Sequence, residues 1–409
     1  MGAFLPGALP ATKWSIRSVK LTVSHVIPYL GLGQGGPVNS LSGYVRGLRA
    51  SDCKVGVLAA PRAEDGQDAQ LPEGIDILRC RPAFCGNFRF CPALRRAVRS
   101  SGADIIHSHG LWTYASCAAG QAAQAMRAPH VLSPCGMLQS GAIRRSRMKK
   151  WICRRLFQDR VLKNANCLHA KSSAEVKGIR AFGLTNPVAV IPNPVCGPEA
   201  TDRSWGGPCK TELEGKSGKS VLYLGRIHPV KGLSRLLEAW SRLWKTHRDW
   251  RLILAGPDEG GYQAKLEQQI WSAGIGGTVT FTGPVQGDAK WKLLQSCDVF
   301  VMPSDFENFG TAVAEAMLCG KPVITTNGTP WRQLPEEHAG WCVNPSIGSI
   351  EQAMREAMTL DHATRMEMGQ RGKEIASPFT PEKVGRQLLE LYTWLMNGAT
   401  SPSFVQFAE

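Results

Sequence analysis

The chain has 409 residues, of which 43% are hydrophobic and 20% are charged. This length exceeds one ordinary core and suits two domains, and the composition excludes a disordered chain. No run approaches 18 consecutive apolar residues, so the sequence predicts no membrane-spanning helix. Residues 1–18, an expected N-terminal extension, lack the continuous apolar core and the small-residue cleavage site of a signal peptide.

The formal net charge of +15 is concentrated in one half of the chain. Residues 1–200 contain 26 Lys and Arg against 10 Asp and Glu, whereas the remainder contains 22 against 23. This asymmetry predicts that the first half faces nucleic acid, an acidic lipid surface or a phosphorylated substrate. The thirteen cysteines form no CxxC pair and no zinc-like cluster, which favours buried thiols in a reducing cytoplasm.

Short apolar runs alternate with helical stretches through the first half, which predicts parallel α/β architecture. The expected strands are 19–28, 54–60, 103–109, 129–134, 166–170 and 188–192. The expected helices are 38–49, 111–126, 143–163 and 173–182. We therefore expect a doubly wound, Rossmann-like domain over 19–195, on the acceptor side of the molecule.

A stretch rich in Gly, Pro and polar residues at 196–218 predicts a linker. After it, the expected strands are 219–225, 251–256, 278–283, 298–303, 322–326 and 340–344. The expected helices are 233–246, 262–273, 287–296, 310–319, 349–358 and 361–376. They predict a second Rossmann-like domain over 219–380, a helix 381–397 that packs back on the first domain, and a tail 398–409. Ligands of such folds lie at the carboxyl ends of strands, so two facing domains imply a shared cleft.

The first loop, at 29–41, contains GLGQGG, a formal G-x-G-x-x-G pattern. A dinucleotide site needs an acidic residue at the end of the next strand, but none follows before Glu64. The glycines instead predict close approach of backbone amides to a diphosphate, with Pro37 as the first helical residue.

His107 and His109 follow in the segment DIIHSHG. His107 falls within the strand and is expected in the core. His109 lies where the strand gives way to a loop, at the functional edge of the sheet. It is expected to hydrogen-bond hydroxyl groups near a reacting carbon, although an ordinary polar loop residue remains the alternative.

The segment 142–163 contains nine Lys or Arg and one Asp, with apolar residues at helical spacing. Two interpretations stay open. In the first, the helix contacts an anionic membrane surface or the acceptor. In the second, it is an ordinary domain helix whose apolar stripe packs on the core and whose basic face is solvated. The charge asymmetry favours the surface contact, whose expected residues are Arg144, Arg145, Lys149, Lys150 and Trp151.

In the second half, LYLGRIHPVKGL at 222–233 places Arg226 and Lys231 at the carboxyl end of a strand. Two cations there can stabilise the negative charge that grows on a departing diphosphate, although a solvated turn would carry the same residues.

The stretch 303–331 places Glu307 in a loop before a helix and Glu315 about one turn inside it. The two carboxylates can bracket a ligand across the helix N-terminus, where the amides of Phe309, Gly310 and Thr311 would face a phosphate. A phosphate beside acids that accept hydroxyl hydrogens describes a nucleotide-sugar site. The alternative is an ordinary helix N-terminus with favourably placed acids.

The E-x7-E element at Glu307 and Glu315, the G-R-x4-K element at 225–231, and AEAMLCGKPVI at 314–324 resemble the family 4 retaining glycosyltransferases, also called glycosyl transferases group 1. These enzymes have the GT-B fold, two Rossmann-like domains facing across a cleft. The resemblance runs from the loop near residue 31 to the helix near 396.

The resemblance implies a role for each matched residue. Glu307 would contact the donor sugar, Glu315 the ribose, and Arg226 and Lys231 the diphosphate. His109 would lie near the anomeric centre, which makes His109, Arg226, Lys231 and Glu307 the expected catalytic residues. The remaining expected donor contacts are Gly35, Gly36, Val285, Asn308, Phe309, Gly310 and Thr311. Asn308 replaces a glycine common in relatives and is expected to donate to the sugar or phosphate.

The expected activity is retaining transfer from a UDP- or GDP-sugar to a hydroxyl of a glycolipid or glycan. No D-x-D motif occurs, so we expect no metal and no cofactor. TPW at 329–331 and SPCGML at 133–138 resemble segments of surface-polysaccharide or lipopolysaccharide enzymes, which implies a cytoplasmic location at the inner membrane face. Alternatives are an epimerase or phosphorylase on this fold, or a nucleic-acid-binding protein, for which no motif is present.

Overall fold

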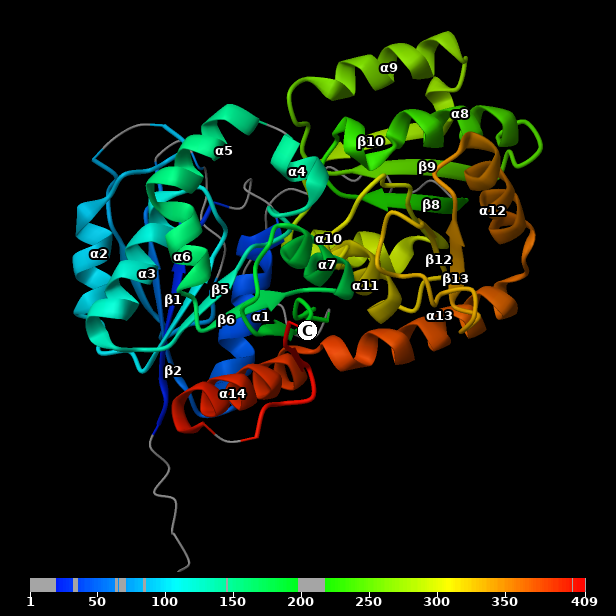
Figure 1. Ribbon diagram of the computed structural model, residues 1–409. Helices are drawn as coiled ribbons and strands as arrows, with labels where there is room; N and C mark the ends of the chain where they lie inside the picture. The colour runs from blue at the N-terminus through cyan, green and yellow to red at the C-terminus, as the bar shows by residue number, and fades with distance from the viewer. Residues whose placement is uncertain are drawn as a thin grey trace, which may run out of the picture.

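The computed structural model describes residues 20–31, 36–62, 65, 71–83, 86–144, 146–197, 218–398 and 400–408. These segments form two α/β domains that lie side by side (Figure 1). The expected N-terminal extension and most of the expected linker lie outside the described residues, as do Gly35 and Arg145. The cysteines that are described are free thiols.

The N-terminal domain is built on an eight-stranded sheet of order β14-β7-β6-β5-β4-β1-β2-β3. Its strands are β1 (Thr22–Ile27), β2 (Lys54–Ala59), β3 (Asp76–Arg79), β4 (Ile105–His109), β5 (His130–Ser133), β6 (Cys167–Ala170), β7 (Val188–Val190) and β14 (Val405–Gln406). All pairs are parallel except β14 with β7. The sequence did not predict β3, which is a short edge strand with mostly exposed side chains, or β14, which has only two residues.

Helices cover both faces of this sheet. They are α1 (Gly36–Ala50), α2 (Pro92–Arg99), α3 (Tyr114–Met126), α4 (Ser140–Arg144), α5 (Arg147–Cys153), α6 (Asp159–Lys163) and α7 (Ser173–Ala181). The prediction of one continuous helix over 143–163 is wrong. Ser146 adopts a left-handed conformation with φ of 58° between α4 and α5, and a π-helical turn at Arg154–Gln158 separates α5 from α6.

The C-terminal domain has a six-stranded parallel sheet of order β10-β9-β8-β11-β12-β13. Its strands are β8 (Lys219–Leu224), β9 (Trp250–Ala255), β10 (Val279–Gly283), β11 (Val299–Met302), β12 (Val323–Thr326) and β13 (Gly340–Val343). Its helices are α8 (Leu233–Leu243), α9 (Tyr262–Ser272), α10 (Gly287–Ser296), α11 (Thr311–Leu318), α12 (Ile347–Thr359) and α13 (His362–Ala376). The inner strands are apolar runs buried on both faces, as parallel sheets require. The two parallel sheets confirm the expected fold class.

The last helix, α14 (Pro381–Asn397), returns to the N-terminal domain and packs along α1 (Figure 1). The two backbones approach closely because glycines meet at the crossing. A Cβ added at Gly47 would lie 1.8 Å from the carbonyl oxygen of Pro381, and one at Gly385 would lie 2.2 Å from the carbonyl carbon of Gly47. Leu388 and Tyr392 of α14 are buried in the core of the first domain. One helix therefore joins the two halves of the chain.

The carboxyl ends of the two sheets face each other. Asn308, after β11, donates to Glu175 of α7 across 3.0 Å. Asn193, after β7, donates to the hydroxyl of Thr311 on α11 across 3.4 Å. The loops predicted to carry chemistry therefore meet at one place between the domains.

Candidate active site

The N-terminus of α11 forms one wall of the site. Gly310 caps it with φ of 76°, a left-handed conformation that favours glycine. Trp331 donates its indole N–H to the carbonyl of Phe309 across 2.7 Å, and Phe309 is 5% exposed. In the described part of the chain, the amides of Phe309, Gly310 and Thr311 donate to no backbone carbonyl. Three donors at the positive end of a helix are thus held open to an anion.

Glu307, two residues before Phe309, forms an ion pair with Lys231. Lys231 Nζ lies 2.5 Å from Glu307 Oε1, which also accepts a hydrogen bond of 2.8 Å from Ser304. The two side chains are only 12% and 13% exposed. The sequence predicted both residues separately, and the structure brings them together at the carboxyl ends of β8 and β11.

Glu315 has a cationic partner that sequence reasoning missed. Lys290 Nζ, on α10, lies 2.8 Å from Glu315 Oε1, and both side chains are mostly buried. The sequence signal for Lys290 was weak. It was a lysine in the helix that follows β10, and the carboxyl end of β10 also faces the cleft. Val285 lies in the loop from β10 to α10 and is partly buried against the domain core.

Arg226 points to a different partner. Its guanidinium is paired with Glu259, and both side chains are more than 40% exposed. Burial raises the pKa of Tyr29, in the first domain, to about 12, and nearby Arg226 partly opposes that rise. Arg226 therefore lies close to the opposite domain, but it does not join Lys231 and Glu307 in this structure. Gly36 opens α1, and an added Cβ there would meet nothing within 4 Å.

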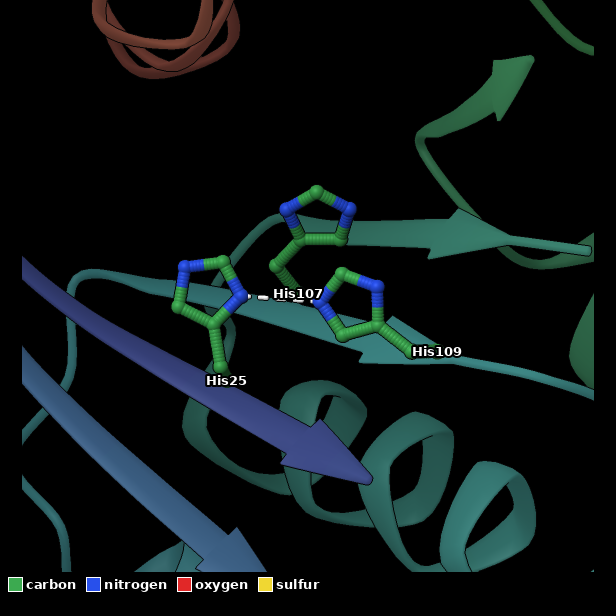
Figure 2. A group of neighbouring side chains, drawn as sticks. All are labelled: His25, His107 and His109. Atoms are coloured by element: carbon green, nitrogen blue, oxygen red, sulfur yellow. Dashed lines mark hydrogen bonds between the residues drawn. The ribbon is translucent and has the colours of Figure 1, made fainter. Parts of the chain in front are cut away.

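His109 lies at the carboxyl edge of the first sheet, but its setting differs from the expected loop. It is the last residue of β4 and only 2% exposed, because β1 and β4 pair side by side and stack their histidines. His25 Nδ1 and His109 Nε2 lie 2.8 Å apart, and the His107 ring stacks on His109 at 4.4 Å (Figure 2). His107 is in the core, as predicted.

Burial keeps these imidazoles neutral. It lowers the pKa of His25 to about 3, and it lowers the pKa of His107 and His109 well below the ordinary value. Burial also lowers the pKa of Lys171 to about 8. The Lys171 ammonium lies 3.0 Å from His169, a fourth buried histidine. The sequence signal for this cluster was a polar histidine inside each of several apolar strands.

Ring nitrogens of His25, His107 and His109 all lie within 4.8 Å of one another, a spacing that three metal ligands can adopt. Two observations favour a hydrogen-bonded cluster instead. The His25–His109 distance is that of a hydrogen bond, and the Lys171 ammonium repels a second cation. The absence of a metal remains a prediction.

Glu175, also missed by sequence reasoning, connects the two domains. Its carboxylate accepts hydrogen bonds from the amides of Gly136 and Lys171 at 2.5 and 2.8 Å, and from the Asn308 side chain. Asn308 therefore contacts the first domain in this structure, whereas the sequence predicted a donor contact. Its amide oxygen is buried without a recorded partner among the described residues.

The basic segment exposes its apolar side chains. No residue of α5 is buried, and Trp151 is 55% exposed. Met148, Ile152 and Leu156 are exposed as well. Arg144 and Lys149 are exposed, while Lys150 is half-buried over the Trp112 ring. The alternative of a stripe packed on the core is therefore wrong for α5, because Ser146 and the π-helical turn detach it from the helices around it.

Comparison with known families decides the class of this chain. The family described as "Glycosyl transferases group 1" matches residues 210–375, and the "Glycosyl transferase 4-like domain" matches residues 35–194. The chain belongs to the group 1 glycosyltransferases. The E-x7-E and G-R-x4-K elements of this glycosyltransferase both lie within the first match.

Relatives and solved structures agree with this assignment. A D-inositol 3-phosphate glycosyltransferase of Corynebacterium urealyticum is 26% identical over 88% of this chain and 91% of its own. The sucrose-phosphate synthase of Thermosynechococcus elongatus superposes with a TM-score of 0.73 at 19% identity, over 93% of this chain and 100% of its own. Anabaena HepE in complex with UDP and glucose superposes with a TM-score of 0.70 at 20% identity, over 90% and 98%. These glycosyltransferase structures share the two-domain GT-B fold.

The sequence predicted no membrane-spanning helix, and the helices of the structure can be compared with that prediction. Among the described residues, no helix is both long enough and apolar enough to cross a bilayer.

Proposed function

We propose that this glycosyltransferase transfers a sugar from a nucleoside-diphosphate sugar to a hydroxyl of a glycolipid or glycan, with retention of anomeric configuration. The observation that carries the proposal is the Lys231–Glu307 ion pair together with the open amides at Phe309, Gly310 and Thr311, which follow Glu307 closely in sequence. A nucleoside-diphosphate sugar presents a diphosphate beside sugar hydroxyls, which are the groups that cations, amides and a carboxylate bind.

Departure of the nucleoside diphosphate develops negative charge on its outer phosphate. Lys231 and the α11 amides are fixed before the reaction and would stabilise that charge without reorganising. Arg226 would add a second cation after leaving its exposed partner Glu259, which costs little because surface ion pairs are weak. These groups would stabilise the charge of the leaving diphosphate, as a metal ion does in other enzymes. We therefore propose metal-independent transfer with no cofactor.

Retention would follow if the acceptor attacks from the face that the diphosphate leaves, assisted by the departing phosphate. Glu307 would orient the donor sugar, Glu315 the ribose, and Asn308 would reach the donor when it releases Glu175. Gly35, Gly36 and Val285 would complete the donor contacts. His109 would lie near the anomeric centre as a neutral hydrogen-bonding group, because burial lowers its pKa well below the usual range.

The donor nucleoside would be uridine or guanosine, and the structure of Anabaena HepE with UDP supports uridine. Epimerase or phosphorylase chemistry on the same fold would use the same donor contacts. Product analysis with and without an acceptor separates these reactions from transfer, because an epimerase acts on the nucleotide sugar alone and a phosphorylase requires inorganic phosphate.

The exposed surface of the basic segment 142–163 suits contact with a membrane. Trp151, Met148 and Leu156 are exposed beside Arg144 and Lys149 on the strongly basic half of the chain. Exposed aromatic and apolar groups flanked by cations suit the interface of an anionic bilayer. We therefore propose peripheral binding at the cytoplasmic face of the inner membrane, with a lipid-linked acceptor in surface polysaccharide or lipopolysaccharide synthesis, and no nucleic-acid partner.

A screen of nucleotide sugars for thermal stabilisation tests the donor proposal, because a ligand that binds only the native state raises its apparent stability. One UDP- or GDP-sugar should raise Tm in the wild type and fail to do so in Lys231→Ala. Stabilisation of both proteins to the same extent would refute the site, and stabilisation of neither by any such sugar would refute the donor class.

A further inference from the structure

A cavity of about 830 Å³ lies in the N-terminal domain, away from the cleft between the domains. Helices α2, α3 and α6 line this open pocket, and residues at the amino ends of β5 and β6, among them Pro129 and Asn166, form its floor. His109 and Lys171 lie at the carboxyl ends of the same sheet. The cavity therefore opens at the opposite edge of the sheet from the candidate active site, and its volume is typical of small-molecule sites.

The cavity is lined by cations. Arg95 and Arg99 of α2, Arg127 after α3 and Arg160 of α6 all contribute to its wall. No carboxylate lines it, and within the described part of the chain none of these four guanidinium groups forms an ion pair. Four like charges around one volume raise its positive potential, which an anion would relieve.

Both Arg95 and Arg127 are exposed, and local structure orients the side chain of the first and the backbone of the second. Arg95 donates to the side-chain oxygen of Gln121 across 3.1 Å. Arg127 ends α3 in a left-handed conformation with φ of 56°, a position where glycine or asparagine is favoured. The backbone after it is fixed because the His130 amide donates to Asn166 across 2.9 Å. Glycine at 127 would relieve the backbone but would remove one guanidinium group from the cavity.

We propose that this cavity is a second anion site, which binds a phosphate-bearing ligand. Guanidinium groups make paired, charge-assisted hydrogen bonds to phosphate oxygens. Leu156 and Phe157 line another part of the wall, and Leu156 is 76% exposed. A phosphate next to an apolar wall fits an anionic lipid headgroup, and a soluble phosphate ester shares the same anionic group. The site uses none of the proposed donor residues, so it stands independently of the transferase reaction.

Isothermal titration calorimetry on the full chain tests the proposal. Every protein carries Arg226→Ala and Lys231→Ala, so that the donor site contributes no binding. The probes are inorganic pyrophosphate and, separately, dioctanoyl phosphatidic acid below its micelle-forming concentration. We expect binding that Arg99→Gln with Arg127→Gln weakens by at least about tenfold, since charge-assisted hydrogen bonds are lost. Increasing salt should weaken it too.

The matched control replaces Arg371 and Arg386 by Gln. These arginines are exposed on α13 and α14, so the same charge is lost away from the cavity, and the affinity should stay within about twofold. Arg95→Gln with Arg160→Gln provides a second, independent pair, and circular dichroism verifies that each variant folds. Tighter binding of phosphatidic acid than of pyrophosphate would identify a lipid ligand, and the reverse order a soluble phosphate. Absence of binding by both probes, or unchanged affinity in both arginine pairs, would overturn the proposal.

Discussion

Lys231 Nζ lies 2.5 Å from Glu307 Oε1, although the two residues are 76 positions apart and belong to loops after different strands. Parallel strands bring their carboxyl ends to one edge of the sheet, so loops distant in sequence meet there. The pair holds a cation and an anion side by side, and in the proposed function they would bind a phosphate and sugar hydroxyls. Each group also neutralises the other while the site contains no ligand.

Lys231→Ala should lower kcat/KM for transfer by roughly 10²- to 10³-fold, as expected when one fixed donor to the developing charge is lost. Glu307→Gln should lower it as well, because an amide accepts sugar hydroxyl hydrogens less strongly than a carboxylate. Steady-state kinetics with the donor found in the screen measures both. Lys292→Ala, an exposed lysine of α10, is the control and should retain full activity. Wild-type turnover by Lys231→Ala would remove the assigned role.

The Asn308–Glu175 hydrogen bond should hold the two domains together. Asn308→Ala removes it and should shift the equilibrium toward an open form by about tenfold, as for a hydrogen bond to a charged group. Asn308→Asp should open the protein further, because two carboxylates then face each other. Small-angle X-ray scattering measures the radius of gyration, and Asn344→Asp, on an exposed residue, serves as the control. Identical scattering from all four proteins would show that this contact does not hold the domains.

Gly47→Ala should destabilise the protein strongly, because its methyl group would lie 1.8 Å from the carbonyl oxygen of Pro381. Helices α1 and α14 would have to separate, at a cost of roughly 1–3 kcal/mol or more, as for overpacked cores. Urea unfolding measures the change. Gly277→Ala is the matched control, since nothing lies within 4 Å of an added Cβ there. Equal midpoints for the two variants would contradict the close crossing.

Stability should fall as the pH drops below about 6.5. Burial lowers the pKa of His130 from 6.5 to about 4, so between these values the unfolded chain binds a proton that the folded chain excludes. Stability therefore rises with pH through this window and is lost on acidification. At pH 5 one such histidine contributes about 2 kcal/mol of destabilisation relative to neutral pH.

His130→Asn should reduce the slope of unfolding free energy against pH between 4 and 6.5 by about one proton. Urea titrations at several pH values measure the slope. His362→Asn, on an exposed histidine of α13, should leave it unchanged. A wild-type slope in His130→Asn would show that His130 is not the proton-linked group.

Trp151→Ser with Leu156→Ser should weaken flotation with vesicles that contain phosphatidylglycerol. The two exposed side chains would lose roughly 1.5–3 kcal/mol each of burial in the interface. Trp271→Ser, which removes an 83% exposed tryptophan from the other domain, is the control and should float like the wild type. Unchanged flotation of the double variant would exclude this surface as the membrane contact.

The sequence by itself determined the alternating strands and helices, the two Rossmann-like domains and the motifs that contain Arg226, Lys231, Glu307 and Glu315. These follow from local signals, because strand ends, helix starts and spaced charges are written in short stretches of the chain.

Tertiary structure alone decided which of these groups meet. The pairing of Lys290 with Glu315, the bridge from Asn308 to Glu175 and the burial of His109 against His25 all join residues from separate elements. The break at Ser146 also overrode a helical pattern that looked continuous. Local propensity favours most of the elements, but side-chain partners and burial depend on how the elements pack, which no short stretch specifies.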